Sequence, residues 1–278
     1  MRSPARCSPR YDADVLVWHW VQQHRLLSVL ALAIVIIVTL GGTAWALVFR
    51  TVSSPVGLRE ALRVYRREQT SKMLESLRAH LQAPGVYTYR TKGSEGLSML
   101  GLTRGFPETT YMVVADNNCA TVSWIPITQH TEATTVCPSA GGAFSVPRMV
   151  TRESIAGTTT TSTIECPANA FLLPAAARSG QRWRANCSLA DPAETVTVDG
   201  EMLGSSTVAV AGHQTSVEHT RLTLIFTGAE RGTDPTDFWV VPSTGLIVRE
   251  KEAVDVTQGG VRYTENMDTV LTGLTPAR

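Results

Sequence analysis

An uncharged run, Leu26–Phe49, constrains the fold of this chain more than any other feature. A helix over this run, at about 1.5 Å per residue, is roughly 36 Å long, which exceeds the ~30 Å hydrocarbon core of a bilayer. Trp18, Trp20 and Trp45 lie near its two ends, as in the aromatic belts of membrane helices. The run therefore predicts a transmembrane helix over residues 26–49 that acts as an uncleaved signal anchor.

Two other interpretations of the run stay open. In a cleaved signal peptide, Ala44-Trp45-Ala46 supplies a small-x-small cleavage site, although the run is longer than the usual apolar region of such peptides. A buried helix of a globular core usually has a polar stripe, whereas here only Ser28, Thr39 and Thr43 are scattered around the run.

The cysteines indicate which side of the membrane the long C-terminal part occupies. Arginines flank the run on both sides, so charge does not decide its orientation, and long segments translocate largely regardless of charge. Beyond the run lies an even set of four cysteines, which argues for disulfides in an exported domain. The prediction is a single-pass cell-membrane protein with a cytoplasmic N-terminus and an extracytoplasmic C-terminal domain. The four are Cys119, Cys137, Cys166 and Cys187.

Four cysteines allow three pairings. We expect Cys119 to pair with Cys137 and Cys166 with Cys187, because each pair joins strands that are near in the sequence. A zinc site needs short C-x-x-C spacings and partner histidines, which this chain lacks. The cysteines therefore predict structural disulfides and no metal site.

The chain divides into four predicted segments: a cytoplasmic tail over 1–25, the transmembrane helix over 26–49, a linker and amphipathic helix over 50–84, and a β-rich extracytoplasmic domain over 85–278. Ser54 as N-cap and Pro55 at the first helical position start the amphipathic helix. Its apolar side chains recur at helical spacing and should pack on the sheet that follows. They are Leu58, Leu62, Tyr65, Met73, Leu74, Leu77 and Leu81.

After Gly85 the apolar period changes from 3.6 to 2, and β-branched and aromatic residues predominate. The fold class expected is α+β, with one helix packed on a curved, mainly antiparallel sheet. Thr233-Asp234-Pro235 and Pro242–Gly245 are typical of hairpin turns. The expected strands are 86–90, 111–114, 195–198, 217–226, 238–241 and 246–248.

The motifs of the common enzyme classes are absent from the sequence. His213 and His219 are six residues apart, a spacing that fits no local metal motif. Glu250 and Glu252 alternate with Lys251 on one strand, which predicts a solvent-exposed face. The formal net charge of +1 gives no electrostatic basis for nucleic-acid binding. We therefore expect no catalytic, cofactor-binding or metal residue, no cofactor, and no enzyme activity.

The order of elements resembles a known group. After the helix come Gly85–Tyr89, Gly180–Trp183, Val208–His213, Asp237–Trp239 and Pro242–Glu250. Over roughly residues 55–275 this order resembles a group of uncharacterised exported proteins of high-GC Gram-positive bacteria, whose C-terminal half is similar to the half-barrel of lipoprotein carriers. The resemblance implies a half-barrel that holds an acyl chain, a lipidated protein or a regulatory partner on its concave face.

Three functions are consistent with these features. The first is a membrane-anchored extracytoplasmic non-catalytic binding domain for an apolar, lipid-like or cell-envelope ligand. The second is a structural or regulatory partner of another membrane protein. The third is an enzyme of an unrecognised kind. The sequence favours the first, with the membrane as a partner.

Overall fold

The computed structural model describes residues 53–68, 82–98, 101–116, 119–155, 158–189 and 195–278. Within these ranges no helix is both long and apolar enough to cross a bilayer. The predicted tail and transmembrane helix, residues 1–49, lie outside the described residues. The predicted single-pass localisation is corrected accordingly, because the described residues contain no helix on which such a topology could rest.

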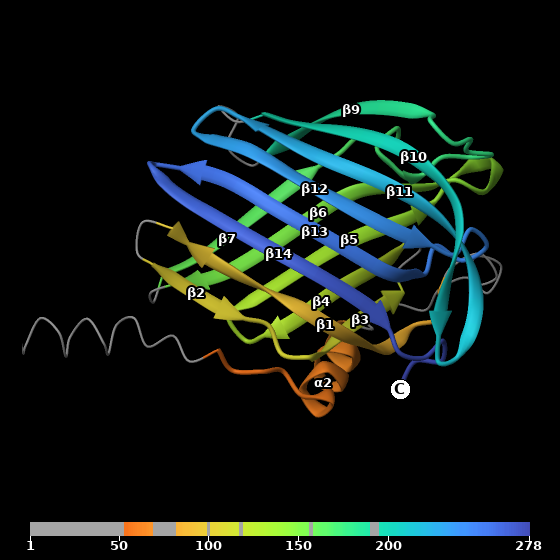
Figure 1. Ribbon diagram of the computed structural model, residues 1–278, viewed down its shortest axis with the longest axis horizontal. Helices are drawn as coiled ribbons and strands as arrows, with labels where there is room; N and C mark the ends of the chain where they lie inside the picture. Colours follow the sequence, from red (N-terminus) through yellow and green to blue (C-terminus); the bar gives the residue numbers. More distant parts are fainter. Residues whose placement is uncertain (1–52, 69–81, 99–100, 117–118, 156–157, 190–194) are drawn as a thin grey trace, which may run out of the picture. The chain divides into compact units, whose positions relative to one another are not determined.

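Strands make up nearly all of the described chain (Figure 1). The helical elements are α2 (Leu58–Glu68) and a short 3₁₀ turn, η2 (Ala140–Gly142). The strands are β1 (Gly85–Leu97), β2 (Leu102–Gly105), β3 (Thr109–Asp116), β4 (Ala120–Ile127), β5 (His130–Pro138), β6 (Phe144–Ile155), β7 (Thr158–Glu165), β8 (Phe171–Leu173), β9 (Arg182–Leu189), β10 (Thr195–Val210), β11 (His213–Thr227), β12 (Glu230–Val240), β13 (Ile247–Gln258) and β14 (Val261–Leu271).

The sheet closes on itself. Neighbouring strands pair antiparallel, and the last strand, β14, pairs with β1 from Tyr89↔Leu271 to Leu97↔Tyr263. The described residues thus form a closed barrel of 12 strands, with β2 added beside β1 and β8 beside β6. The predicted α+β half-barrel was wrong, because the pairing of β1 with β14 leaves no open edge between the first and last strands of the barrel.

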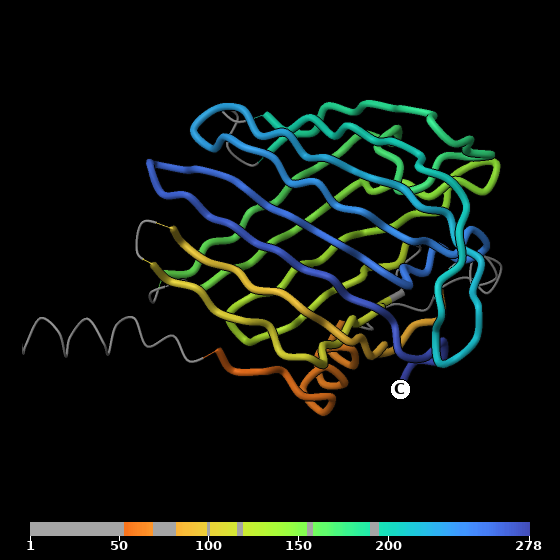
Figure 2. The backbone as a smooth tube through the Cα atoms, in the orientation of Figure 1, coloured from red at the N-terminus to blue at the C-terminus, as the bar shows by residue number. Residues whose placement is uncertain are grey.

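The barrel is flattened into two walls. In Figures 1 and 2 the strands β12, β13 and β14 cross over β5, β6 and β7 at a steep angle. The hairpin of β10 and β11 is long, and it bends where the register shifts between Met202 and Gly204. Val210 and Val217, near its tip, are buried in the core of the barrel, while the turn over residues 211–214 is exposed.

Helix α2 covers the outside of the barrel. Its buried residues Ala61 and Tyr65 pack against Val86, Val113 and Ile125 of β1, β3 and β4. The expected packing of this helix on the sheet is therefore present. The helix begins at Leu58 rather than at Pro55, because residues 54–56 run extended beside the end of β4, with backbone hydrogen bonds between them and residues 126–128. The expected continuation over 69–81 lies outside the described residues.

Two disulfides link neighbouring strands. Cys119 is bonded to Cys137 and Cys166 to Cys187, each with 4.4 Å between the Cα atoms. This is the pairing expected from the sequence. The first joins β4 to β5, which also pair along most of their length. The second joins the end of β7 to β9, which pair at only two positions, Ile164↔Leu189 and Glu165↔Ser188.

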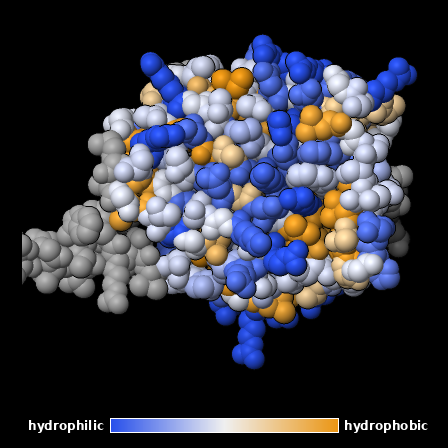
Figure 3. Space-filling view, in the orientation of Figure 1, coloured by the Kyte–Doolittle hydropathy of each residue, from blue (hydrophilic) through white to orange (hydrophobic). Residues whose placement is uncertain are grey.

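The face of the barrel seen in Figure 3 is largely polar. Arginines of one strand pair with carboxylates of the next, as in Arg184–Asp199, Arg221–Asp237 and Arg249–Asp268. Apolar residues in this view occur in small scattered groups.

Candidate functional site: an acidic cavity inside the barrel

The barrel holds a cavity of about 650 Å³ between its two walls, which opens to solvent beside the exposed residues Thr158, Thr160 and Val261. Residues of β5, β6 and β7 line one side, and residues of β11 to β14 line the other. Several lining residues stand at strand ends, including Leu97, Thr158, Leu189 and Val261. The cavity therefore extends toward the end of the barrel at which β6 leads into β7 and β13 into β14.

Much of the cavity wall is apolar. Leu222, Leu224 and Phe226 alternate along β11, and Phe238 and Val254 continue this surface on β12 and β13. Met149 and Ile164 face them from β6 and β7. This alternation follows the period of 2 of a β-strand, which places every second side chain inside the barrel.

The rest of the wall is acidic. None of the described lining residues is Lys, Arg or His. A group of carboxyl groups with no cation in the lining itself is unusual, because buried charges are ordinarily paired. Glu132 and Glu153 contact His130, which lies outside the lining. The acidic lining residues are Glu132, Glu153, Glu230, Asp234, Glu250, Glu252 and Glu265.

Glu250 and Glu252 lie on the inner face of β13, with Val254 and Val256 after them. The expectation that these two carboxylates face solvent was wrong, since Glu252 is only 7% exposed. In a closed barrel every strand has one enclosed face, and here Lys251 and Asp255 take the outer face. Burial raises the pKa of Glu250 to about 8 and that of Glu252 well above its ordinary value, with nearby Glu132 and Asp234 adding to both.

Asp234 reaches the cavity from the middle of β12, where a turn was expected. Thr233-Asp234-Pro235 forms no turn because β12 stays paired with β11 through it, at Thr223↔Pro235 and Leu224↔Asp234. The hydroxyl of Thr236 donates to Asp234 Oδ1 at 3.0 Å. Burial, followed by the charge of Glu132, raises the pKa of Asp234 to about 6. The other expected turn, Pro242–Gly245, does connect β12 to β13.

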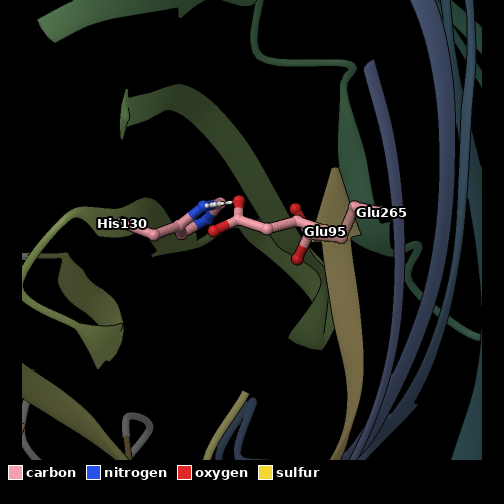
Figure 4. Close-up of side chains that lie close together, drawn as sticks. All are labelled: Glu95, His130 and Glu265. Carbon is pink, nitrogen blue, oxygen red and sulfur yellow. Dashed lines mark hydrogen bonds and ion pairs between the residues drawn. The ribbon is translucent and has the colours of Figure 1, made fainter. Parts of the chain in front are cut away.

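A buried ion cluster adjoins the cavity (Figure 4). His130 at the start of β5 contacts Glu95 of β1 through Nδ1, at 2.7 Å from Oε2, and Glu132 through Nε2, at 2.9 Å from Oε1. Arg104 of β2 donates to the other oxygen of Glu95. Glu265 of β14 stands beyond Glu95, and their strands pair at this position.

The cluster holds charges of both signs. Burial alone would lower the pKa of His130, but the charge of Glu265 and contacts with Glu132, Glu153 and Glu95 raise it well above its ordinary value. Burial opposes ionisation of Glu95, yet His130 and Arg104 lower its pKa to about 2. His130 is therefore an imidazolium between carboxylates, and each of its ring nitrogens donates to a carboxylate.

Glu265 connects the ion cluster to the cavity. The hydroxyl of Tyr263 lies 2.6 Å from its Oε2, while its Oε1 has no hydrogen-bond partner. Glu252 Oε2 is also buried without a partner. Burial raises the pKa of Glu265 well above its ordinary value, and the charges of Glu132 and Glu95 add to this while that of His130 opposes it.

Among the described residues, two sets of side chains have the spacing of a cation site. In the first, Glu95, His130 and Glu265, both ring nitrogens of the histidine are already engaged by carboxylates, so this set does not fit a metal ion. In the second, one oxygen each of Glu132, Glu252 and Glu265 lie within 4.8 Å of one another. All three of these residues line the cavity, so this set can hold a cation there.

The residues singled out in the sequence lie elsewhere. The four cysteines form the disulfides, on strands around the barrel wall. His213 is exposed at the β10–β11 turn, and His219 stacks on Trp239 with 4.1 Å between ring centroids, so the two histidines form no joint site. His130, Glu95 and Glu265 had no local motif, but each sits on the inward period of its strand among apolar neighbours.

Comparison with known proteins gives little further guidance. No family model matches the chain, and no curated protein matches it. One similar solved structure is that of the hypothetical lipoprotein YmcC from Escherichia coli, 14% identical, with 81% of this chain and 99% of that chain covered at a TM-score of 0.34. This likeness is too low to support an argument about function. The resemblance to exported proteins of high-GC Gram-positive bacteria is not supported by these comparisons.

Proposed function

We propose that this protein is a non-catalytic binding protein that holds a small molecule inside its barrel. The observation that carries this proposal is the cavity of about 650 Å³, which has an apolar wall and a group of convergent polar side chains. Ligand sites in proteins typically measure about 300–1,000 Å³ and combine these two kinds of surface. Barrels too wide to be filled by their own side chains commonly enclose such cavities.

The apolar part of the ligand rests on β11 and β12. Leu222 and Leu224 are almost completely buried, and with Phe226 and Phe238 they form one wall of the cavity. An apolar or lipid-like body placed there removes its surface from water, which contributes about 25 cal/mol for each Å² buried. The apolar ligand expected from the sequence is thus retained, with its place moved from an open concave face to a cavity inside the barrel.

A fluorescent apolar probe tests the proposal. N-phenyl-1-naphthylamine brightens on entering an apolar site, so titration of the purified protein in detergent-free buffer should give saturable binding. Leu224→Trp places a larger side chain in the cavity and should weaken this binding about tenfold, because cavity volume is lost.

The matched control is Thr223→Trp, since the neighbouring residue on β11 has its side chain on the outer face. It should leave the affinity for the probe unchanged. Circular dichroism and thermal melting would verify that both variants fold. A folded Leu224→Trp variant with unchanged affinity, or a wild-type protein that never saturates, would contradict binding inside the barrel.

A further inference from the structure

We propose that the ligand of this cavity carries a protonated amine, which Glu132, Glu252 and Glu265 hold at one end of its apolar body. This inference rests on the proposed function and names its ligand class. The three carboxylates come from β5, β13 and β14, and therefore from both walls of the barrel. A cationic group between them would join the two walls.

The spacing of the three oxygens suits an ammonium group. A primary ammonium has three N–H donors in tetrahedral directions. At a charge-assisted hydrogen-bond length of about 2.8 Å, three acceptors around it stand about 4.6 Å apart. The oxygens of Glu132, Glu252 and Glu265 lie within 4.8 Å of one another. One cation can thus be shared by all three carboxylates.

Two of these side chains each have one buried oxygen that accepts no hydrogen bond. Glu265 is 1% exposed and Glu252 is 7% exposed, and each has one buried oxygen without a hydrogen-bond partner, Oε1 and Oε2 respectively. Such atoms are rare in folded proteins, since leaving a buried acceptor unsatisfied is costly. Both residues line the cavity, so a donor on a ligand can reach them there.

The cationic side chains near the cavity, Arg104 and His130, are engaged by other groups. Arg104 donates to Glu95 and to the carbonyl of Ser154, and His130 is engaged by Glu95 and Glu132. Asp234 and Glu250 add two more carboxyl groups to the same cavity. The cavity therefore has an excess of acidic groups for which its own lining offers no cation.

The apolar wall favours an organic cation over a metal ion. An ion bound by the three carboxylates alone makes no contact with the cavity side of Leu222, Leu224 and Phe238, although they border the same cavity. An alkyl or aryl amine places its cationic end among the carboxylates and its body on these residues. Both the acidic and the apolar parts of the lining then contact the ligand.

Three probes with the same tail test the inference: decylammonium, decanol and decanoate, each titrated by competition with N-phenyl-1-naphthylamine. Decylammonium should bind at least about tenfold more tightly than decanol, because it alone forms charge-assisted hydrogen bonds with the carboxylates. Decanoate should also bind more weakly than decylammonium, because it brings no N–H donor to the unpaired oxygens of Glu252 and Glu265. The double variant Glu252→Gln with Glu265→Gln should abolish the preference for decylammonium and retain the binding of decanol.

The control variant is Asp255→Asn, which removes a carboxylate from the outer face of β13, where it pairs with Arg262. It should keep the full preference for decylammonium. If decanol and decylammonium bind equally to the wild type, or if the double variant keeps the preference, the inference is overturned while binding inside the barrel stands. If calcium chloride alone displaces the probe and the double variant is insensitive to it, the site belongs to a metal ion and the inference is also overturned. If no probe binds at all, both proposals fail.

Discussion

At the scale of single residues, His130 is the centre of the buried ion cluster. It is 1% exposed, and besides its contacts with three carboxylates its ring packs in a T-shaped geometry with Phe106 and Trp124, at 5.9 and 5.6 Å between centroids. Its charge offsets that of Glu95, which is also buried. Removing one partner of a buried ion pair leaves an uncompensated charge, which is more costly than never having had the pair.

We therefore expect His130→Gln to destabilise the protein by about 3–5 kcal/mol. Urea denaturation followed by tryptophan fluorescence would measure the free energy of unfolding. The control is His219→Gln on the outer face, where the histidine side chain is 23% exposed. It should cost no more than about 1 kcal/mol. Equal losses in the two variants would show that the charge of His130 contributes nothing beyond ordinary packing.

The sequence did not identify His130 or its partners as a site. Glu95, His130 and Glu265 are far apart in the chain, and each has a different local context. Only the register between β1 and β14 places Glu95 beside Glu265. A period of 2 predicts which side chains share a face of one strand, but not which strands become neighbours. Glu250 and Glu252 are an example. The sequence indicated that they share one face of a strand, but not that this face lies inside the barrel.

At the scale of elements, the strands recognised from the sequence are those rich in β-branched and aromatic residues, such as β1, β3 and β11. Strand β14 was missed, because Thr, Glu and Asp interrupt its apolar residues. These polar residues belong to the acidic interior and to the outer ion pairs. The acidic residues that make the cavity unusual therefore also hid β14, the strand that closes the barrel, from recognition in the sequence.

The two disulfides differ in the extent of strand pairing beside them. Their sequence separations, 18 and 21, are similar, so each should stabilise the chain by about 3 kcal/mol through the entropy of the unfolded state. The bond between Cys166 and Cys187, however, lies where β7 and β9 pair at only two positions. The bond between Cys119 and Cys137 adds to a long ladder between β4 and β5.

Replacing both Cys166 and Cys187 with serine should therefore loosen the barrel locally as well as lower its stability. Hydrogen exchange should speed up in β7 and β9 of this variant. The matched variant, with serine at Cys119 and Cys137, should lose a similar free energy of unfolding yet keep slow exchange in β4 and β5. Identical exchange patterns in the two variants would argue against a weak junction between β7 and β9.

At the scale of the whole molecule, the buried acids link stability to pH. The folded-state pKa values of Asp234, Glu250, Glu252 and Glu265 are raised, so the folded protein holds protons that the unfolded chain releases. Their contribution to stability is present below the unfolded pKa of about 4 and is lost as the pH rises through the folded values. His130, whose pKa is also raised, loses its contribution in the same direction above about pH 6.5.

Glu95 acts in the opposite direction, since its pKa is lowered to about 2 and its contribution is lost only as the pH falls toward that value. Between pH 5 and pH 8 its contribution stays constant, so the melting temperature of the ligand-free protein should fall as the pH rises. Differential scanning calorimetry at several pH values would measure this slope. The slope should be shallower in the double variant Glu252→Gln with Glu265→Gln. A melting temperature that rises over this range would contradict the assignment of these groups as buried acids with raised pKa values.

The pairing of β1 with β14 has a kinetic consequence. These strands stand near opposite ends of the described chain, so residues 85–271 must all be synthesised before the two strands can pair along their full length. Until then the incomplete sheet has two unpaired edges and exposes side chains of the barrel interior to solvent. Both features favour aggregation. Because contacts between residues distant in the sequence slow folding, we expect the pairing of β1 with β14 to be a slow final step of folding.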